Sequence, residues 1–397
     1  MLADRLRHIT ASATLKVAAE ADRLRRAGVD VVDLGAGEPD FDTPPHVKTA
    51  GVGAIQANFT RYTPSAGILE LREAVCARYR ADYGVEISPA EVLITAGGKQ
   101  SLFNAALALF NPGDEVITHA PFWPTIPEQV KLAGATPVIV RSHADDGFTV
   151  DAGAIVAAMT PRTRAIVLNS PTNPTGALIS EEAVAAIADA AASRDVWVIV
   201  DLCYERLIYD RVPHNLPGIL LDRHRRRTVL CGSASKAYAM TGWRCGWTIA
   251  PADVIAACNT IQGHSTSNIA SMTQKAAIAA LTGPQDTVAA MLDEYRTRRD
   301  HVHAWLTANP AIRCLRPRGA FYLLPDISAL LSPGGVRTAA QFAQALLEQA
   351  HVAVTPGEAF DAPGHIRISY ATSIDQLREG ATRILKFAEA LQQAPAR

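Results

Sequence analysis

The feature that most constrains this chain is an alternation, between residues 90 and 250, of short apolar runs with alanine-rich helical stretches. The stretches include 99–110 and 180–193, where Ser180 is a suitable N-cap. Strands without a polar face are buried on both sides, so we expect an α/β fold: a mainly parallel sheet with helices on both faces. The β-branched runs predict seven strands, at 91–98, 114–120, 136–141, 163–170, 196–201, 228–233 and 243–250.

The pattern of apolar runs changes after about residue 285. From there, long helical stretches at 293–306 and 338–350 are separated by short strand-like segments. This α+β pattern predicts a second, smaller domain. Residues before 45 hold one helix and then the Pro/Gly/Asp-rich segment GAGEPDFDTPP. We therefore divide the chain into 1–44 (an N-terminal arm and part of the small domain), 45–287 (the large domain) and 288–397 (the small C-terminal domain).

The charge pattern gives no general reason to bind nucleic acid or an anionic membrane, since the formal net charge is −1. One basic run, 223–227, is expected to be a solvated loop. The six cysteines show no metal-ligand spacing, which indicates reduced thiols, an intracellular protein and no metal site. The start of the chain lacks the apolar region of a signal peptide, and no run approaches the roughly 18 apolar residues of a membrane span. We expect a soluble, cytoplasmic protein.

An acid and a lysine follow two strands that we expect to be neighbours. Asp201 ends the strand 196–201 after five apolar residues. A carboxylate there is costly unless it meets a cation or a strong donor, so Asp201 is either an N-cap or the partner of a protonated heterocyclic nitrogen. Lys236 follows the strand 228–233. It is either a surface lysine or a poorly solvated amine able to form a Schiff base.

The residues around Lys236 suit an anionic ligand. In the stretch SASKAYAMTGWR, Ser233 and Ser235 offer hydroxyls, and the planar fork of Arg244 is suited to a phosphate group. The small neighbours of the lysine leave room for a cofactor beside the amine.

Three further residues have both a structural and a functional interpretation. Asn173, in the constrained octet NSPTNPTG, belongs to a turn or donates its amide to a phenolic oxygen on a ring. Trp123 packs in the core or stacks on that ring. Arg367 alternates with apolar residues in HIRISYAT, and is either a solvated strand residue or a bidentate clamp for a carboxylate.

Taken together, these motifs resemble the class I/II aminotransferases, which are fold-type I pyridoxal-phosphate enzymes. The resemblance is nearest to the bacterial aspartate (aspartate/prephenate) subgroup and covers nearly the whole chain. It implies a PLP-binding large domain and a homodimer with shared active sites that transfers an amino group between an L-amino acid and a 2-oxo acid. The motifs that carry it, in the family's order, are SATLKV, GAGEPDFDTP, RYTPSAGILELREAV, TAGGKQSLFN, NSPTNPTG, SASKAYAMTGWR, GAFYLL and HIRISYATS.

The resemblance also implies a role for each matching residue. Lys236 is the Schiff-base lysine and general acid/base, Asp201 keeps the pyridine nitrogen protonated, and Tyr204 assists at the phenolic oxygen. The other implied cofactor contacts are Gly98, Lys99, Trp123, Asn173, Ser233, Ser235, Arg244 and, from the neighbouring subunit, Tyr62. The implied substrate contacts are Gly37, Trp123, Asn173, Arg367 for the α-carboxylate, and Ser12, Thr14 and Lys99 for a distal carboxylate.

The chain departs from the family pattern in two places. Leu202 and Cys203 stand where the family commonly has glutamate and isoleucine after the pyridine-binding acid, which puts the local support of Asp201 in question. The segment 262–268 carries no arginine to bind a distal carboxylate. Acidic, aspartate- or glutamate-type substrates are therefore only modestly favoured over aromatic or alanine-like ones.

Three other functions stay open at this point. The same lysine, aspartate and arginine would serve a β-lyase, a decarboxylase or another carbon–carbon-cleaving PLP enzyme. A ligand-sensing regulator would need an N-terminal DNA-binding domain, for which the segment before Gly35 is short. A vestigial, non-catalytic site is disfavoured because every ring-contacting residue is retained.

Overall fold

The structure is a computed structural model that describes residues 2–10, 13–332 and 335–393; within α1, the side chains of residues 13–16 and 18 are not described. Its largest sheet has seven strands in the order β2-β8-β7-β6-β5-β3-β4, and β8 alone runs antiparallel to its neighbours. The predicted mainly parallel sheet is therefore confirmed. Its strands are β2 (Val92–Thr95), β3 (Glu115–Ala120), β4 (Thr136–Arg141), β5 (Thr163–Asn169), β6 (Trp197–Asp201), β7 (Thr228–Ser233) and β8 (Gly246–Ile249).

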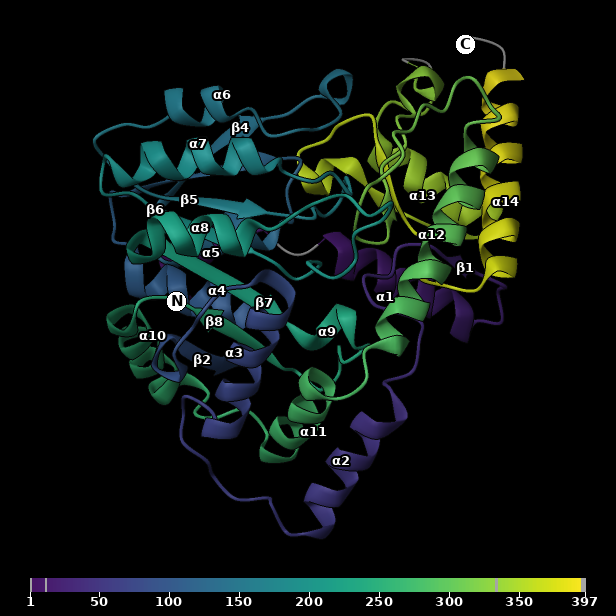
Figure 1. The fold of residues 1–397 in the computed structure, drawn as a ribbon. Coiled ribbons are helices and arrows are strands. Elements are labelled where there is room, and N and C mark those ends of the chain that lie inside the picture. Colours follow the sequence, from purple (N-terminus) through teal and green to yellow (C-terminus); the bar gives the residue numbers. More distant parts are fainter. Residues whose placement is uncertain (1, 11–12, 333–334, 394–397) are drawn as a thin grey trace.

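Both faces of this sheet are buried, as its apolar strands require. Alternate residues of β6 enter different cores: Val198 and Val200 face one, while Trp197 and Ile199 face the other. Helices pack on both sides (Figure 1). They are α2 (Pro45–Gln56), α3 (Leu69–Tyr83), α4 (Gly98–Leu109), α5 (Thr125–Leu132), α6 (Ala152–Ala157), α7 (Glu181–Ala192), α8 (Leu216–His224), α9 (Ala234–Ala237), α10 (Ala252–Ser265) and α11 (Ser271–Thr282).

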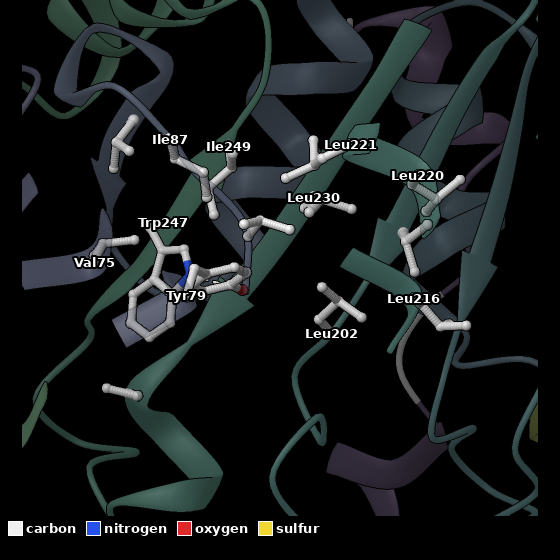
Figure 2. Close-up of a cluster of buried hydrophobic side chains, with 14 of the residues drawn as sticks. Val75, Tyr79, Ile87, Leu202, Leu216, Leu220, Leu221, Leu230, Trp247 and Ile249 are labelled. Carbon is white, nitrogen blue, oxygen red and sulfur yellow. Dashed lines mark hydrogen bonds between the residues drawn. The ribbon is translucent and has the colours of Figure 1, made fainter. Parts of the chain in front are cut away.

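Figure 2 shows the core between the sheet and the helices α3 and α8. Trp247 of β8 meets Tyr79 of α3, and the indole Nε1 donates to the Tyr79 hydroxyl over 3.1 Å. The expected N-cap is also present, since Ser180 Oγ accepts from the Ala183 amide at the start of α7. Burial of this kind stabilises the sheet whose strand ends carry the site.

A second unit lies beside the sheet and has a core of its own (Figure 1). It contains α12 (Asp286–Leu306), α13 (Ala339–Ala350) and α14 (Ile374–Gln393), the three-stranded sheet β11-β12-β9, and the pair β1-β10. The N-terminal segment joins this unit through β1 (Val32–Asp33), which pairs in parallel with β10 (Val352–Ala353). The remaining elements are α1 (Ala13–Arg26), β9 (Tyr322–Leu323), β11 (Thr355–Pro356), β12 (Ile366–Ser369) and six single 3₁₀ turns, at 4–7, 89–91, 144–146, 225–227, 328–330 and 357–360.

The separate cores support the predicted division at 44 and 287, which stays a prediction. Helix α12 starts at Asp286, so the boundary falls inside its first turn. The sequence analysis did not identify α14. Its buried residues, including Leu377, Gly380, Ala381 and Ile384, follow the three- and four-residue spacing of an amphipathic helix.

The basic run 223–227 lies on the surface and is largely ion-paired. Arg223 and His224 lie against Asp189, at 3.4 and 2.6 Å, and Arg227 pairs with Asp195. A basic run neutralised in this way is not a free cationic patch. No helix among the described residues is long and apolar enough to cross a membrane.

Candidate active site

A cavity of about 550 Å³ lies at the carboxyl ends of β5, β6 and β7. This is the edge where ligand sites of open α/β sheets form. The other unit also lines the cavity. Its residues come from β9, β12 and the segment 33–38, which we call the crossing segment because it leads from β1 toward the large domain. The lining consists of Asp33, Gly35, Ala36, Gly37, Glu38, Gly98, Lys99, Trp123, Asn169, Asn173, Asp201, Cys203, Tyr204, Ser233, Ser235, Lys236, Thr241, Arg244, Tyr322 and Arg367.

Asp201 ends β6 and is almost fully buried. Burial raises the pKa of its carboxyl to about 6, and the Cys203 amide, which donates to Oδ1 over 3.0 Å, acts against that shift. The donor amide lies two residues further along the chain, which is the spacing of a turn. No helix begins there, so Asp201 is not an N-cap. A buried acid that lines a cavity and has one amide donor is suited to receive a cationic group.

Lys236 lies in the short helix α9, which follows β7, and β7 is the parallel neighbour of β6. The two strand ends therefore bring Asp201 and Lys236 to one cavity, as predicted. The Nζ atom donates to the Gly37 carbonyl over 2.5 Å. The residue is only half-buried, so the expectation of a poorly solvated amine is met in part.

Arg244 and the start of α4 form a cationic corner of the cavity. The Arg244 backbone has φ +56°, and its guanidinium donates to the carbonyls of Thr241 (2.8 Å) and Ala96 (3.0 Å). Gly97, the N-cap of α4, has φ +85°, and a Cβ there would lie 2.7 Å from Arg244 Nη2. Only glycine suits that position. The helix has no side-chain cap, so its first amides and the arginine together suit a phosphate group.

Two serines close this corner from the β7 side. Ser233 Oγ bonds to Ser235 Oγ over 2.9 Å and accepts from the Ser235 amide. Gly98 packs against Ser233, since a Cβ on Gly98 would lie 3.5 Å from the serine Cβ. The predicted phosphate ligands are therefore brought together.

Lys99 and Trp123 lie side by side at the mouth of the cavity, with the lysine Nζ 4.9 Å from the indole centroid. Desolvation in the cavity lowers the pKa of Lys99, and the positive charges of Arg244 and Lys236 lower it further. With Arg367, four cations line the cavity, and none of them forms a salt bridge among the described residues, which favours a ligand with more than one negative charge. Trp123 packs against the core of that face and also lines the cavity, so its stacking on a ring stays a prediction.

Arg367 is 3% exposed, which rules out the solvated alternative. Nη1 donates to Asn173 Oδ1 over 3.1 Å and Nη2 to the Gly35 carbonyl over 2.9 Å. Its Nε is buried and has no partner in the described part of the chain. The guanidinium lies 4.3 Å from the Tyr322 ring centroid. Among the described residues no carboxylate pairs with Arg367, so this buried cation is suited to an anionic ligand.

Tyr204 and Tyr322 share a hydrogen bond of 2.8 Å between their hydroxyls, and both line the cavity. Burial holds the pKa of Tyr204 well above its usual value, so its hydroxyl keeps its proton and can donate. The sequence analysis quoted GAFYLL but gave Tyr322 no role. The period of that strand could have indicated an inward tyrosine, but not its contact with Tyr204.

Three predicted residues are not placed in the cavity. Tyr62 is 91% exposed, away from the lining residues of its own chain. Ser12 lies outside the described residues, and the side chain of Thr14, in α1, is not described. Two lining residues were not predicted from the sequence: Asn169, which begins the octet NSPTNPTG, and Glu38, which accepts from Thr241 Oγ1 over 2.9 Å.

Comparisons with known proteins agree with this geometry. The family model "Aminotransferase class I and II" matches residues 29–384. The chain belongs to the class I and II aminotransferases. This aminotransferase is 41% identical to an aspartate aminotransferase of Geobacillus stearothermophilus, over 98% of this chain and 99% of that one. It is 43% identical to an aspartate/prephenate aminotransferase of Thermus thermophilus, with 99% of each chain covered.

Solved structures match equally well. An aspartate aminotransferase from Thermus thermophilus with maleate superimposes with a TM-score of 0.91 and 41% identity, covering 98% of this chain and 99% of the other. The aspartate aminotransferase of Rhizobium meliloti gives a TM-score of 0.93 at 39% identity, with the same coverage. The predicted fold type I, the transaminase activity and the pyridoxal phosphate cofactor are thereby confirmed.

The residues present fit that cofactor. Asp201 is a buried acid suited to a protonated ring nitrogen, and the Arg244 corner is suited to a phosphate. Among the described residues no group of three His, Cys, Asp or Glu side chains could hold a metal ion. The thiol of Cys203 keeps its proton, since burial raises its pKa to about 12.

Proposed function

We propose that this aminotransferase acts on dicarboxylic, aspartate- or glutamate-type amino acids and their 2-oxo acids. The observation that carries the proposal is a pair of cations in the cavity, the buried Arg367 and Lys99, neither of which has a carboxylate partner among the described residues. Arg367, whose buried Nε has no partner among the described residues, would take the α-carboxylate, and Lys99 would take the distal one. Maleate, named with the Thermus thermophilus relative, is also a dicarboxylate.

The wall formed by the large sheet would hold the cofactor. Asp201 would pair with the ring nitrogen, Asn173 and Tyr204 would donate to the phenolic oxygen, and Trp123 would stack on the ring. The phosphate would be held by Arg244, Ser233, Ser235 and the amides of Gly98 and Lys99. When bound, pyridoxal phosphate supplies an electron sink for the charge left when the α-proton is removed.

Lys236 would hold the cofactor covalently and, once free, would move the proton between the substrate carbon and the cofactor. Its amine lies at the cavity wall and is already held by the Gly37 carbonyl, on the crossing segment. Gly37, which has no side chain, would leave space for the substrate next to Arg367. Ser12 and Thr14 would assist Lys99 at the distal carboxylate.

We also propose a homodimer in which Tyr62 completes the phosphate site of the partner subunit. Large apolar side chains are exposed along one stretch: Val52 (52%), Ile55 (53%), Tyr62 (91%) and Leu69 (48%). Exposed apolar side chains gathered in one segment are typical of a surface that a second copy covers. The protein would act in the cytoplasm, in line with its six free thiols.

The assignment of Lys236 is tested with Lys236→Ala, and the exposed Lys386→Ala serves as the surface control. The first variant should bind the cofactor non-covalently and show no transamination, while the control should keep both properties. Turnover in Lys236→Ala would overturn the assignment.

The substrate class is tested by single-turnover absorbance changes with aspartate, glutamate, alanine and phenylalanine. The dicarboxylic amino acids should react at least about 10-fold more efficiently, since a second ion pair adds to binding. Equal efficiency with phenylalanine would contradict the proposal.

Light scattering tests the dimer, and a monomer with full activity would exclude a shared site.

A further inference from the structure

Asn169 occupies a central place in the cavity wall that no proposed role yet explains. It is the last residue of β5, is 1% exposed, and lies opposite Asp201 in the register between β5 and β6. It also lines the cavity. A buried amide side chain at a strand end must satisfy both its donor and its acceptor within the protein.

The Asn169 side chain bridges two segments that carry cofactor ligands. Its Nδ2 donates to the Asp201 carbonyl over 3.2 Å, and its Oδ1 accepts from the Asn173 amide over 2.9 Å. One side chain thereby connects the end of β6 to the loop 170–176. The connection extends further, because Asn173 Oδ1 accepts from Arg367 Nη1.

The Asn169 backbone is itself fixed from two directions. Its amide donates to His119 Nε2 over 3.2 Å, and its carbonyl accepts from Thr172 Oγ1 over 2.8 Å. Burial lowers the pKa of His119 to about 4, so the imidazole stays neutral and Nε2 remains an acceptor. Because the Asn169 backbone is fixed, the position of its side-chain amide relative to both partners is also defined.

We propose that Asn169 is a positioning residue that fixes Asp201 and Asn173 relative to each other, and thereby aligns the ring-nitrogen partner with the phenolic-oxygen donor and the carboxylate clamp. This inference rests on the proposed function for the roles of those three ligands. The two bonds run in opposite senses, one donated and one accepted. Alanine supplies neither bond, and an ionised aspartate supplies only the acceptor.

The test compares Asn169→Ala and Asn169→Asp with the unmodified enzyme. For the cofactor-free protein we measure the dissociation constant of pyridoxamine phosphate, which needs no covalent bond. For the holoenzyme we measure the pH midpoint of the visible absorbance of the bound cofactor, and kcat and KM for the amino acid.

Asn169→Ala should weaken pyridoxamine phosphate by about 10-fold, because two buried hydrogen bonds that align its ligands are lost. It should also shift the absorbance midpoint and raise KM. Asn169→Asp, of nearly equal shape, keeps the acceptor for the Asn173 amide. It should therefore weaken the cofactor yet keep KM within about 2-fold of the unmodified enzyme. If Asn169→Ala does not fold, this second variant still decides the question.

Thr175→Val is the matched control, since it removes one hydrogen bond of the same loop, the one that Thr175 Oγ1 accepts from the Ala177 amide over 3.1 Å, without touching Asn169 or the cavity. It should lower the melting temperature and leave the dissociation constant and the midpoint unchanged. If Asn169→Ala behaves in the same way, Asn169 has only a structural role and the inference is wrong.

A double variant separates this inference from the proposed function. If Asn169 acts through Asn173, the KM effect of Asn169→Ala should largely disappear in an Asn173→Ala background; additive effects would overturn the inference. If Asp201→Ala and Asn173→Ala both leave cofactor affinity and turnover unchanged, the proposed function fails. If they impair the enzyme and Asn169→Ala does not, only the positioning role fails.

Discussion

The two arginines that line the cavity are held in different ways. Arg244, beside the large sheet, is exposed, has a left-handed backbone, and rests on two main-chain carbonyls. Arg367, on β12 of the other unit, is buried, and its guanidinium lies against the Tyr322 and Phe360 rings at 4.3 and 4.9 Å. Neither pairs with an acid among the described residues.

The difference indicates separate roles for the two walls of the cavity, one formed by the large sheet and the other by β12. An exposed guanidinium attracts an anion but distinguishes poorly between one anion and another. That is sufficient for a cofactor that carries its own phosphate. A buried guanidinium binds an anion that matches its fork, and is costly to leave unpaired. We therefore expect changes to the large-sheet wall to affect the cofactor, and changes to the β12 wall to affect the substrate.

The largest expected effect is on substrate use by Arg367→Ala. Removing one partner of a buried charge pair should lower kcat/KM for aspartate by about 10³-fold, with cofactor affinity nearly unchanged. Arg367→Lys keeps the charge but loses the fork, and should recover only part of the loss. Steady-state kinetics and a cofactor titration measure both quantities. A loss of cofactor affinity instead would remove the distinction between the walls.

Arg244→Ala tests the other wall. We expect the cofactor to dissociate about 100-fold more readily, because charge-assisted bonds to its phosphate are lost, while KM at saturating cofactor stays close to that of the unmodified enzyme. Equilibrium dialysis of the cofactor against both proteins measures the change. An unchanged affinity would show that the helix start and the serines hold the phosphate without the arginine.

Glu205 tests the support behind the large-sheet wall. It follows Tyr204 and accepts from the hydroxyls of Tyr79 (3.1 Å) and Tyr83 (2.9 Å), and burial raises its pKa to about 7. In the unfolded chain this carboxyl ionises near the ordinary glutamate pKa of 4.5. Because the folded state keeps this proton up to a higher pH than the unfolded chain does, the group makes the free energy of unfolding fall as pH rises from about 4.5 to about 7.

Glu205→Gln should remove that dependence. Between about pH 5 and pH 7, the free energy of unfolding of the unmodified protein should decrease by about 2 kcal/mol relative to the glutamine variant. Chemical denaturation of the cofactor-free proteins at both pH values measures the difference, with the exposed Asp375→Asn as control. Parallel pH profiles would show that Glu205 is ionised in the folded protein.

The smallest expected effect belongs to Lys99, which crosses the division because it lies on the large-sheet side but is proposed to bind substrate. Lys99→Met should lower the preference for aspartate over alanine by about 2- to 5-fold, as is typical of a solvent-accessible ion pair. Because its pKa is lowered, the preference in the unmodified enzyme should weaken as pH rises toward the alkaline range. A preference independent of pH and of Lys99 would assign the distal carboxylate to other residues.

Much of the fold could be predicted from local pattern. Each predicted strand of the large sheet is present, because a strand buried on both faces must be apolar throughout and its ends carry turn residues. The helix α14 was missed, although its buried spacing is visible in the sequence. The pairing of β1 with β10 could not be predicted, because it joins residues more than three hundred positions apart.

The sequence by itself determined the fold class and the chemistry at the strand ends, Asp201 and Lys236, since each depends on residues that are close along the chain. The tertiary structure alone decided how those groups are completed. Gly35 meets Arg367, Tyr322 meets Tyr204, and Asn169 connects Asp201 to Asn173. Periodicity shows which face of an element is buried. The atoms that a buried polar group contacts depend on how distant elements pack, and the local pattern does not encode that packing.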